Sequence, residues 1–357
     1  MSVSKPVGKV QTALGLIEAE DLGITLTHEH CLIDARCLYI EPSSTSERIF
    51  AYQPVSLENL WWVRYHPYSN LDNLQLYDEE LAISELSHFK RAGGSTVVDM
   101  SNVGLGRDPL ALTHISRATG LNIIMGAGYY VEESQPPGWQ PDEEKITEEI
   151  VRDITVGVGN TGVRAGVMGQ LGMSLPMTDN EKVALRAAAR AQKLTGVAMK
   201  ICTGRSPNAA FEAIELLDAV GADLSRVSFD HIDRTIRVHE TLVKLAKTGC
   251  YFEHTLFGFE GWYPCRIVLS EENPVRGHIP NDADRIDEIK ALIDEGFLNQ
   301  ILISQDHCWK THLRRYGGPG HAHMLQNVVP LMREKGMPEE HIHTLLVENP
   351  KRLLQVT

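Results

Sequence analysis

The sequence predicts an α/β protein with one (β/α)8 (TIM) barrel, and three observations carry that prediction. Short apolar runs rich in β-branched residues recur eight times, and amphipathic stretches of helical length separate them. The chain of 357 residues suits one barrel domain. No GxGxxG stretch directly follows one of the apolar runs, which disfavours the alternative, a doubly wound open sheet. We therefore expect residues 1–357 to form a single domain.

The apolar runs are the predicted strands. Residues 180–196 illustrate the helices between them, because Gly196 is a typical helix stop. Strand and helix alternate along the whole chain, which is the pattern of a parallel sheet with helical crossovers. In chain order the predicted strands are residues 23–28, 95–100, 122–128, 164–170, 196–202, 226–231, 250–255 and 300–306.

Two connections are longer than the others, about residues 37–76 and 256–281. Both follow a predicted strand, and the first is rich in aromatic residues and proline. Connections that follow barrel strands lie on the C-terminal face, where barrel enzymes build their active sites. We expect both loops to form lids or walls over that face.

Composition excludes several classes of partner. The net charge of −13 disfavours nucleic acid and anionic membranes, which reward clustered basic residues. No apolar run reaches 18 residues, and the first 15 residues lack the apolar core of a signal peptide. The six cysteines show no CxxC spacing, which suits a reducing compartment. We expect a cytoplasmic protein that acts on a small molecule.

Metal-ligating side chains stand at the ends of three predicted strands. His28 and His30 close the first strand, and residues two apart on a strand point to the same side. His231 ends the sixth strand and Asp306 the eighth. A carboxylate there can bind a divalent metal and also take a proton from an attacking water. Each residue alone could be a helix cap, but together they predict a metal centre.

This set resembles the amidohydrolase superfamily and, within it, the phosphotriesterase family. The resemblance runs from about residue 8 to the C-terminus and includes "LTHEH", "GAGYY", "GVMGQLG", "HIDRTI", "RRYGGPGHAHML" and "VENPKRLL". It implies a (β/α)8 barrel with one or two divalent metals, zinc first and manganese as the alternative. It also implies hydrolysis of esters, lactones or amides, and suggests a homodimer. Residue by residue, it carries over the metal ligands His28, His30, His231 and Asp306.

Two positions depart from that family's pattern. The family bridges its metals with a carboxylated lysine or a glutamate at the end of strand four, where this chain has Gln170. It places a metal-binding histidine at the end of strand five, where this chain has Cys202. A neutral amide is a poor bridge between two dications. These changes favour a one-metal site or an inactive one. Cys202 is either a thiolate ligand or, as we favour, a buried cysteine without a role.

Lys200 offers a replacement for the missing bridge. It lies two residues before Cys202 and therefore on the same inward face of its strand. An unpaired ammonium inside a barrel is costly or loses its proton, and a neutral amine can react with CO2 to form a carbamate. Our hypothesis is that carboxylated Lys200 binds metal. The alternatives are a lysine that forms an ion pair inside the barrel, or a strand whose register differs from the predicted one.

The predicted chemistry is metal-assisted hydrolysis of a small carboxylic ester, lactone or N-acyl compound, in preference to an organophosphate. Asp306 would bind a metal ion and shuttle the proton to the leaving group. By resemblance, Tyr130 contacts the substrate or the attacking water, and Arg205 holds a substrate anion, unless it is merely an arginine on the surface. A different class of function is a catalytically inactive barrel that binds a metal or a small molecule. His254 is an extra residue, which we expect beside the site.

Overall fold

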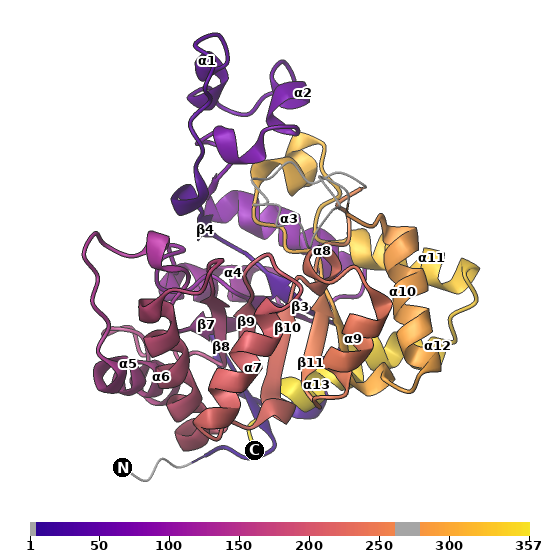
Figure 1. The fold of residues 1–357 in the computed structure, drawn as a ribbon. Helices are drawn as coiled ribbons and strands as arrows, with labels where there is room; N and C mark the ends of the chain where they lie inside the picture. Colours follow the sequence, from indigo (N-terminus) through magenta and orange to yellow (C-terminus); the bar gives the residue numbers. More distant parts are fainter. Residues whose placement is uncertain (1–4, 261–278) are drawn as a thin grey trace.

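The computed structural model describes residues 5–260 and 279–357, and they form the predicted (β/α)8 barrel (Figure 1). Eight parallel strands make one sheet in the order β12-β11-β10-β9-β8-β7-β6-β3. The edges β3 and β12 meet, since the Asp306 amide donates to the His28 carbonyl at 3.1 Å. Each predicted strand overlaps an observed one. The strands are β3 (Thr25–Glu29), β6 (Thr96–Asp99), β7 (Asn122–Ala127), β8 (Val167–Gly172), β9 (Met199–Cys202), β10 (Val227–Asp230), β11 (Tyr251–His254) and β12 (Ile301–Ile303).

Helices surround the sheet, as Figure 1 shows. Local sequence sets their ends: in α6 the Thr178 hydroxyl and the Glu181 carboxylate form a capping box, and Gly196 ends the helix with a φ of 73°. The predicted helix over 180–196 is therefore confirmed. The outer helices are α3 (Glu79–Arg91), α4 (Pro109–Thr119), α5 (Glu143–Thr155), α6 (Asp179–Thr195), α7 (Ala209–Ala219), α9 (His239–Ala246), α10 (Asp282–Asp294), α11 (Val329–Glu334), α12 (Glu339–His343) and α13 (Asn349–Leu354). The short helix α8 (Ile232–Thr235) follows β10 at the C-terminal end of the barrel.

A hairpin of β1 (Lys9–Thr12) and β2 (Gly15–Glu18) lies at the N-terminal end of the barrel. The Ala13 amide donates to the carbonyl of Ile123, near the start of β7, at 2.7 Å. The amide of Val356, the residue before the last, donates to the Lys9 carbonyl at 2.9 Å, so the two ends of the described chain lie together. The hairpin therefore covers the end of the barrel that is opposite the predicted site.

Side chains alternate between two cores along each strand. Val97, Ile123 and Phe229 pack against the helices, while Val98 and Ile124 belong to a separate cluster with the hairpin, inside the barrel. Toward the C-terminal end the interior becomes polar and holds buried threonine, serine and charged residues, namely Thr27, Lys200, Ser228, Asp230 and Glu253. The predicted ligands His28, His30, His231 and Asp306 lie above this polar layer, whereas the predicted ligand Lys200 belongs to it.

The first long connection projects from the barrel, at the top of Figure 1. It contains η2 (Arg36–Leu38), α1 (Arg48–Ala51), α2 (Leu60–Val63) and η3 (Pro67–Ser69), and it returns through β5 (Gln75–Leu76), which pairs with β4 (Ile33–Asp34). Of the second long connection, only residues 256–260 and 279–281 are described. Within the described chain, no helix has the length and apolarity needed to cross a bilayer.

Candidate metal centre and active site

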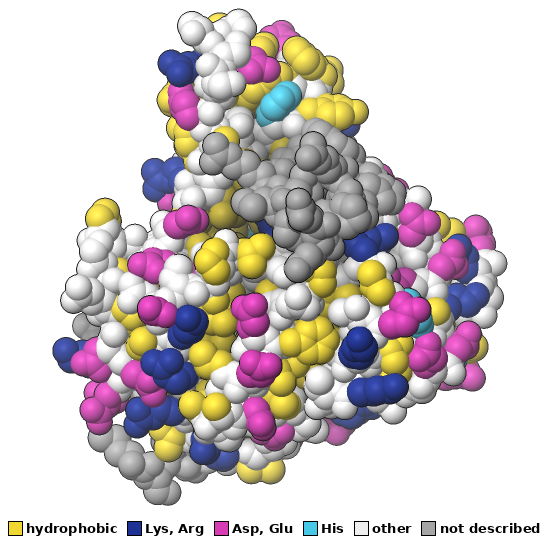
Figure 2. Space-filling view, in the orientation of Figure 1, with side chains coloured by type: hydrophobic (Ala, Val, Ile, Leu, Met, Phe, Trp, Pro, Cys, Tyr) yellow, Lys and Arg dark blue, Asp and Glu magenta, His cyan; other side chains and the backbone are white. Residues whose placement is uncertain are grey.

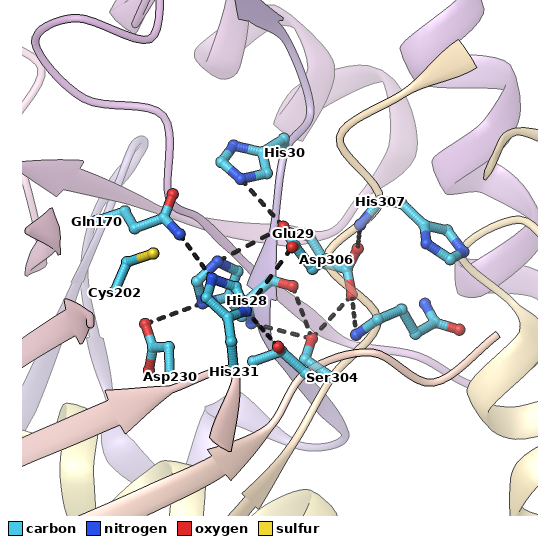
Figure 3. Close-up of polar contacts among 12 residues, drawn as sticks. His28, Glu29, His30, Gln170, Cys202, Asp230, His231, Ser304, Asp306 and His307 are labelled. Atoms are coloured by element: carbon cyan, nitrogen blue, oxygen red, sulfur yellow. Dashed lines mark hydrogen bonds and ion pairs between the residues drawn. The ribbon is translucent and has the colours of Figure 1, made fainter. Parts of the chain in front are cut away.

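Three of the predicted ligands meet at one point on the C-terminal face. His28 Nε2 lies 3.7 Å from Asp306 Oδ1, and His30 Nε2 lies 3.4 Å from the same oxygen (Figure 3). The three donor atoms lie within 4.8 Å of one another, and all three residues are buried. The two neighbouring edges of the barrel, β3 and β12, supply them, which is why residues far apart in sequence form one cluster.

This cluster fits a divalent metal ion. Two ligand atoms of one tetrahedral zinc ion, each about 2.0–2.2 Å from the metal, lie about 3.4 Å apart. Both separations to Asp306 Oδ1 are near that value. His28 Nε2 is buried and has no hydrogen-bond partner, which is rare for a buried polar atom. A cation at this point would give that nitrogen the partner that it lacks.

Hydrogen bonds to the other ring nitrogens orient both histidines for a metal. His28 Nδ1 lies 3.0 Å from Asp230 Oδ2, so that carboxylate holds the proton on Nδ1 and leaves a lone pair on Nε2. His30 Nδ1 lies 2.9 Å from Ser101 Oγ. The Ser101 hydroxyl donates its own proton to the Leu32 carbonyl at 2.6 Å, so it can only accept from His30. His30 Nε2 is therefore also an acceptor.

Strained backbone marks two of the predicted residues. His231 has a φ of 60° and Asp306 a φ of 50°, and they are the two non-glycine residues with positive φ in the described chain. Such a conformation costs about 1–3 kcal/mol in each case and persists where function requires it. His231 directly follows β10, and Asp306 stands three residues beyond the end of β12, so the turn at each residue aims its side chain over the barrel mouth.

His231 lies beside His28, with 4.7 Å between the ring centroids. Its Nδ1 lies 3.7 Å from Asp306 Oδ2 and is hydrogen-bonded to Thr255, and its Nε2 lies 2.8 Å from the Gln170 amide nitrogen. Figure 3 shows Gln170 next to the His231 ring. Burial lowers the pKa of His231 well below its usual value, and the charge of Arg234 lowers it further. His231 is thus a neutral ring at the edge of the three-ligand cluster.

Lys200 lies one layer deeper, inside an ion-pair network. Its Nζ is 3.0 Å from Asp230 Oδ1 and is also hydrogen-bonded to Glu253, and all three residues are fully buried. Burial lowers the pKa of Lys200, but Asp230 and Glu253 raise it above its usual value, so the ammonium keeps its proton. Burial raises the pKa of Glu253 to about 7, whereas Lys200 and His28 hold that of Asp230 at about 2 against the effect of burial.

Lys200 thus forms an ion pair inside the barrel, which was the first alternative to its carboxylation. The register of β9 on β10 explains it, since Lys200 pairs with Ser228 and Cys202 with Asp230, on the inward faces of adjacent strands. The hypothesis that Lys200 is carboxylated started from an amine without an ion-pair partner. Carboxylation of Lys200 stays a prediction, which metal analysis must test.

Glu29, between the two histidines, fixes the segment that follows β12 against the end of β3. Its carboxylate accepts from the amides of Gln305 and His307, at 2.9 and 3.0 Å, and from the Ser304 hydroxyl at 2.8 Å. Burial would raise the pKa of Glu29, but the hydrogen bond to His321 and the charges of that ring and His307 lower it to about 2. This ionised carboxylate clamps the backbone on both sides of Asp306.

Two cavities open above the cluster. The inner cavity, of about 40 Å³, is bounded by His30, Gln170, His231 and Asp306, among others. The outer cavity, of about 480 Å³, reaches Cys202 and the first long connection. Tyr130 and Arg205, the predicted substrate-binding residues, line both cavities.

The side chains around these cavities include one arginine that the sequence did not single out. Arg205 Nη2 donates to the Tyr68 hydroxyl at 3.2 Å. Arg234, in α8, also lines both cavities and donates to Cys202 Sγ at 3.6 Å. His254, expected beside the site, instead pairs with Glu288 of α10 at 2.9 Å, between β11 and the outer helices. Cys202 is buried and faces the outer cavity.

Comparison with known proteins adds three findings. The model of the phosphotriesterase family matches residues 8–354. An N-acetyltaurine hydrolase of Dictyostelium discoideum is 40% identical over an alignment of 377 positions, which covers 99% of this chain and 100% of the relative. A phosphotriesterase-related protein of Nematostella vectensis is 41% identical over 97% of this chain and 98% of its own. The crystal structure of a resiniferatoxin-binding protein from Rhodobacter sphaeroides superimposes with a TM-score of 0.91, at 33% identity, over 98% of this chain and 95% of that one.

Proposed function

The chain belongs to the phosphotriesterase family and is a metal-dependent hydrolase, and from this premise we propose that it cleaves the amide bond of small N-acyl compounds that carry a negative charge. The observation that carries the proposal is the cluster of His28, His30 and Asp306, with its unpartnered buried nitrogen. Relatives at 38–40% identity are named N-acetyltaurine hydrolases. N-acetyltaurine is such an amide, and its amine half ends in a negatively charged sulfonate. Small esters and lactones are the second candidate class of substrate, and organophosphates are the class that we favour least.

We assign the divalent ion to His28, His30 and Asp306, as a single zinc ion or, failing that, manganese. When bound there, the ion would polarise the scissile carbonyl and lower the pKa of an attacking water. His28 and His30 offer neutral nitrogen donors that zinc accepts readily. Asp230 and Ser101 keep those rings in the binding tautomer, and Lys200 holds Asp230 in place.

The proton transfers fall to Asp306. Its Oδ1 faces the two histidines, which leaves Oδ2 for the proton of the attacking water. That proton then passes to the leaving nitrogen, so water adds its hydroxyl to the acyl carbon and its hydrogen to the amine. His231 and Gln170 border the inner cavity and would contact the attacking water or the carbonyl oxygen. Tyr130 and Arg205 bind the substrate, and Arg205 supplies positive charge for its anionic group.

A second candidate function is binding without hydrolysis. It is favoured by the similarity to a protein named for binding resiniferatoxin and by the size of the outer cavity. Gln170 and Cys202, which replace family ligands, are compatible with it. Metal dependence separates the two functions, because a binder would retain its ligand unchanged after metal removal.

The proposal is tested by acetate release from N-acetyltaurine, followed by proton NMR. Zinc- or manganese-loaded protein should release acetate, chelator-treated protein should not, and added metal should restore the activity. Asp179→Asn is a matched control, since that carboxylate lies exposed in the first turn of α6. Binding of the compound without acetate release from the metal-loaded protein would favour the second function.

We also propose a homodimer that forms through the projecting segment. Five large side chains of this segment, Ile49, Tyr52, Leu57, Trp61 and Tyr65, are 59–89% exposed, and Figure 2 shows hydrophobic side chains gathered there. Aromatic side chains bury about 150–250 Å² each when fully covered, so the three aromatic residues together with Ile49 and Leu57 would let two copies bury on the order of 1,000 Å², the lower limit of a specific interface. Light scattering should give a dimer, and Trp61→Glu should give a monomer.

The cysteines of the described chain indicate the cellular compartment in which the protein acts. Cys31, Cys37, Cys202, Cys250 and Cys308 are free thiols, and we propose the cytoplasm as the place of action because its glutathione keeps such thiols reduced. The whole chain would act there as one hydrolase domain, with the first long connection as a wall of the outer cavity.

A further inference from the structure

The two cavities above the cluster differ twelvefold in volume and meet at a neck. The inner one measures about 40 Å³ and the outer one about 480 Å³. The residues that line both, and so form the neck, are Leu38, Tyr68, Tyr130, Arg205 and Arg234. A substrate whose scissile carbonyl lies at the metal must therefore place one half in a small space and the other half in a large one.

The inner cavity limits the acyl half. A water molecule needs about 10–15 Å³ of such volume, so 40 Å³ holds about three groups of that size. The attacking water, the carbonyl group and one methyl group fill it. Its apolar walls Ile33, Leu105 and Trp309 are 3%, 1% and 3% exposed and belong to one packed cluster, so they cannot recede to admit a longer chain. This volume favours an acetyl group as the acyl half of the substrate.

The neck places positive charge close to the scissile bond. Arg205 and Arg234 both stand there, so an anionic group of the leaving half would lie between the two cavities. Planar guanidinium groups match a carboxylate bidentately. An α-carboxylate, attached to the carbon next to the leaving nitrogen, meets this geometry.

Beyond the neck, the outer cavity has mixed walls, in which apolar side chains stand beside Glu133, Ser174 and Thr203. Tyr39, Ile40, Met173 and Leu175 line it, and its volume is that of sites for drug-sized ligands. The leaving half therefore carries a large apolar group as well as its charge. We propose that the preferred substrates are N-acetyl-α-amino acids with a large apolar side chain, held by Arg205 and Arg234 through the carboxylate. This inference rests on the proposed amide hydrolysis and names its substrate class.

The test compares kcat/KM of the metal-loaded protein across matched compounds. N-acetyl-L-phenylalanine should exceed N-acetylglycine by about 30–100-fold, the value of burying a phenyl side chain. Extending the acetyl to a butyryl group should lower the rate by at least 10-fold, because even one misplaced methylene costs about 10–200-fold. Replacing the carboxylate by a carboxamide should also lower it by at least 10-fold.

Variants assign these preferences to residues. Arg234→Gln should reduce the preference for carboxylate over carboxamide at least 10-fold, whereas Arg190→Gln, on the exposed face of α6, should leave it unchanged. Ile33→Val should narrow the preference for acetyl over butyryl, and Leu175→Trp should slow N-acetyl-L-phenylalanine but not N-acetylglycine.

The outcomes separate this inference from the proposed function. If N-acetyl compounds are cleaved but N-acetyltaurine or N-acetylglycine matches N-acetyl-L-phenylalanine, or a butyryl compound matches the acetyl one, the substrate class is wrong and amide hydrolysis stands. If esters or lactones are cleaved and no amide is, the proposed function itself fails.

Discussion

Replacement of Lys200 by methionine tests the interior of the barrel most sharply. The ammonium is fully buried between Asp230 and Glu253, 3.0 Å from the Asp230 carboxylate. Lys200→Met would leave two buried carboxylates without their cation, a loss that typically costs about 3–5 kcal/mol. For a chain of 357 residues that corresponds to a fall in melting temperature of about 4–7 °C.

The cost should depend on pH. Lys200 lowers the pKa of Glu253, which burial holds at about 7, so that pKa rises further when the lysine is removed. Glu253 of the variant is then protonated at pH 6, where the two carboxylates repel less, and ionised only at higher pH. We expect the melting temperature of Lys200→Met to lie closer to that of the unmodified protein at pH 6 than at pH 8.

A double variant separates the ion pair from a metal ligand. Lys200→Met/Glu253→Gln removes one charge of each sign and leaves Asp230 hydrogen-bonded to His28. We expect it to recover most of the lost stability and to bind the same amount of zinc, as measured by mass spectrometry after gel filtration. A folded double variant that has lost its zinc would refute this reasoning and support the carboxylated Lys200.

Three further predictions concern the site and its surroundings. Asp306→Asn should lower kcat about 10²–10⁴-fold in a steady-state assay with metal restored, and a loss under tenfold would remove Asp306 from proton transfer. Ser101→Ala removes the acceptor of the His30 Nδ1 proton and should weaken zinc binding about 10–100-fold in a competition titration while the melting temperature changes little. Burial lowers the pKa of His307 to about 4 and that of His312 well below its usual value, so the unfolded chain binds more protons below about pH 6.5 and stability falls as the pH falls toward 4. In denaturant titrations at pH 7, 6 and 5, His312→Phe should reduce that slope by up to about 1.4 kcal/mol per pH unit, and an unchanged slope would show that His312 is not buried in its neutral form.

Strand positions and strand-end residues were predictable from the sequence, because apolar periodicity and the order of the elements fix which residues reach the C-terminal face. His28, His30 and Asp306 required only that reasoning. Backbone strain at His231 and Asp306 was not predictable, since nothing in their neighbours demands a positive φ.

The partners of the ligands depend on register, which periodicity does not give. Asp230 stands beside His231 in the sequence, yet its bond to His28 spans 202 residues. Pairing each inward position of β9 with its neighbour in β10 would have brought Lys200 and Cys202 to the level of Ser228 and Asp230. Glu253 lies 53 residues beyond Lys200, and predicting its contact with Lys200 would also have required the pairing of β10 with β11.

The location of the metal tests the central claim most directly. Crystals of zinc-loaded protein, measured at the zinc absorption edge, should show one anomalous peak about 2.0–2.2 Å from His28 Nε2, His30 Nε2 and Asp306 Oδ1, above an unmodified Lys200. Two peaks bridged by a carboxylated Lys200, or one peak that none of these three atoms contacts, would contradict the account.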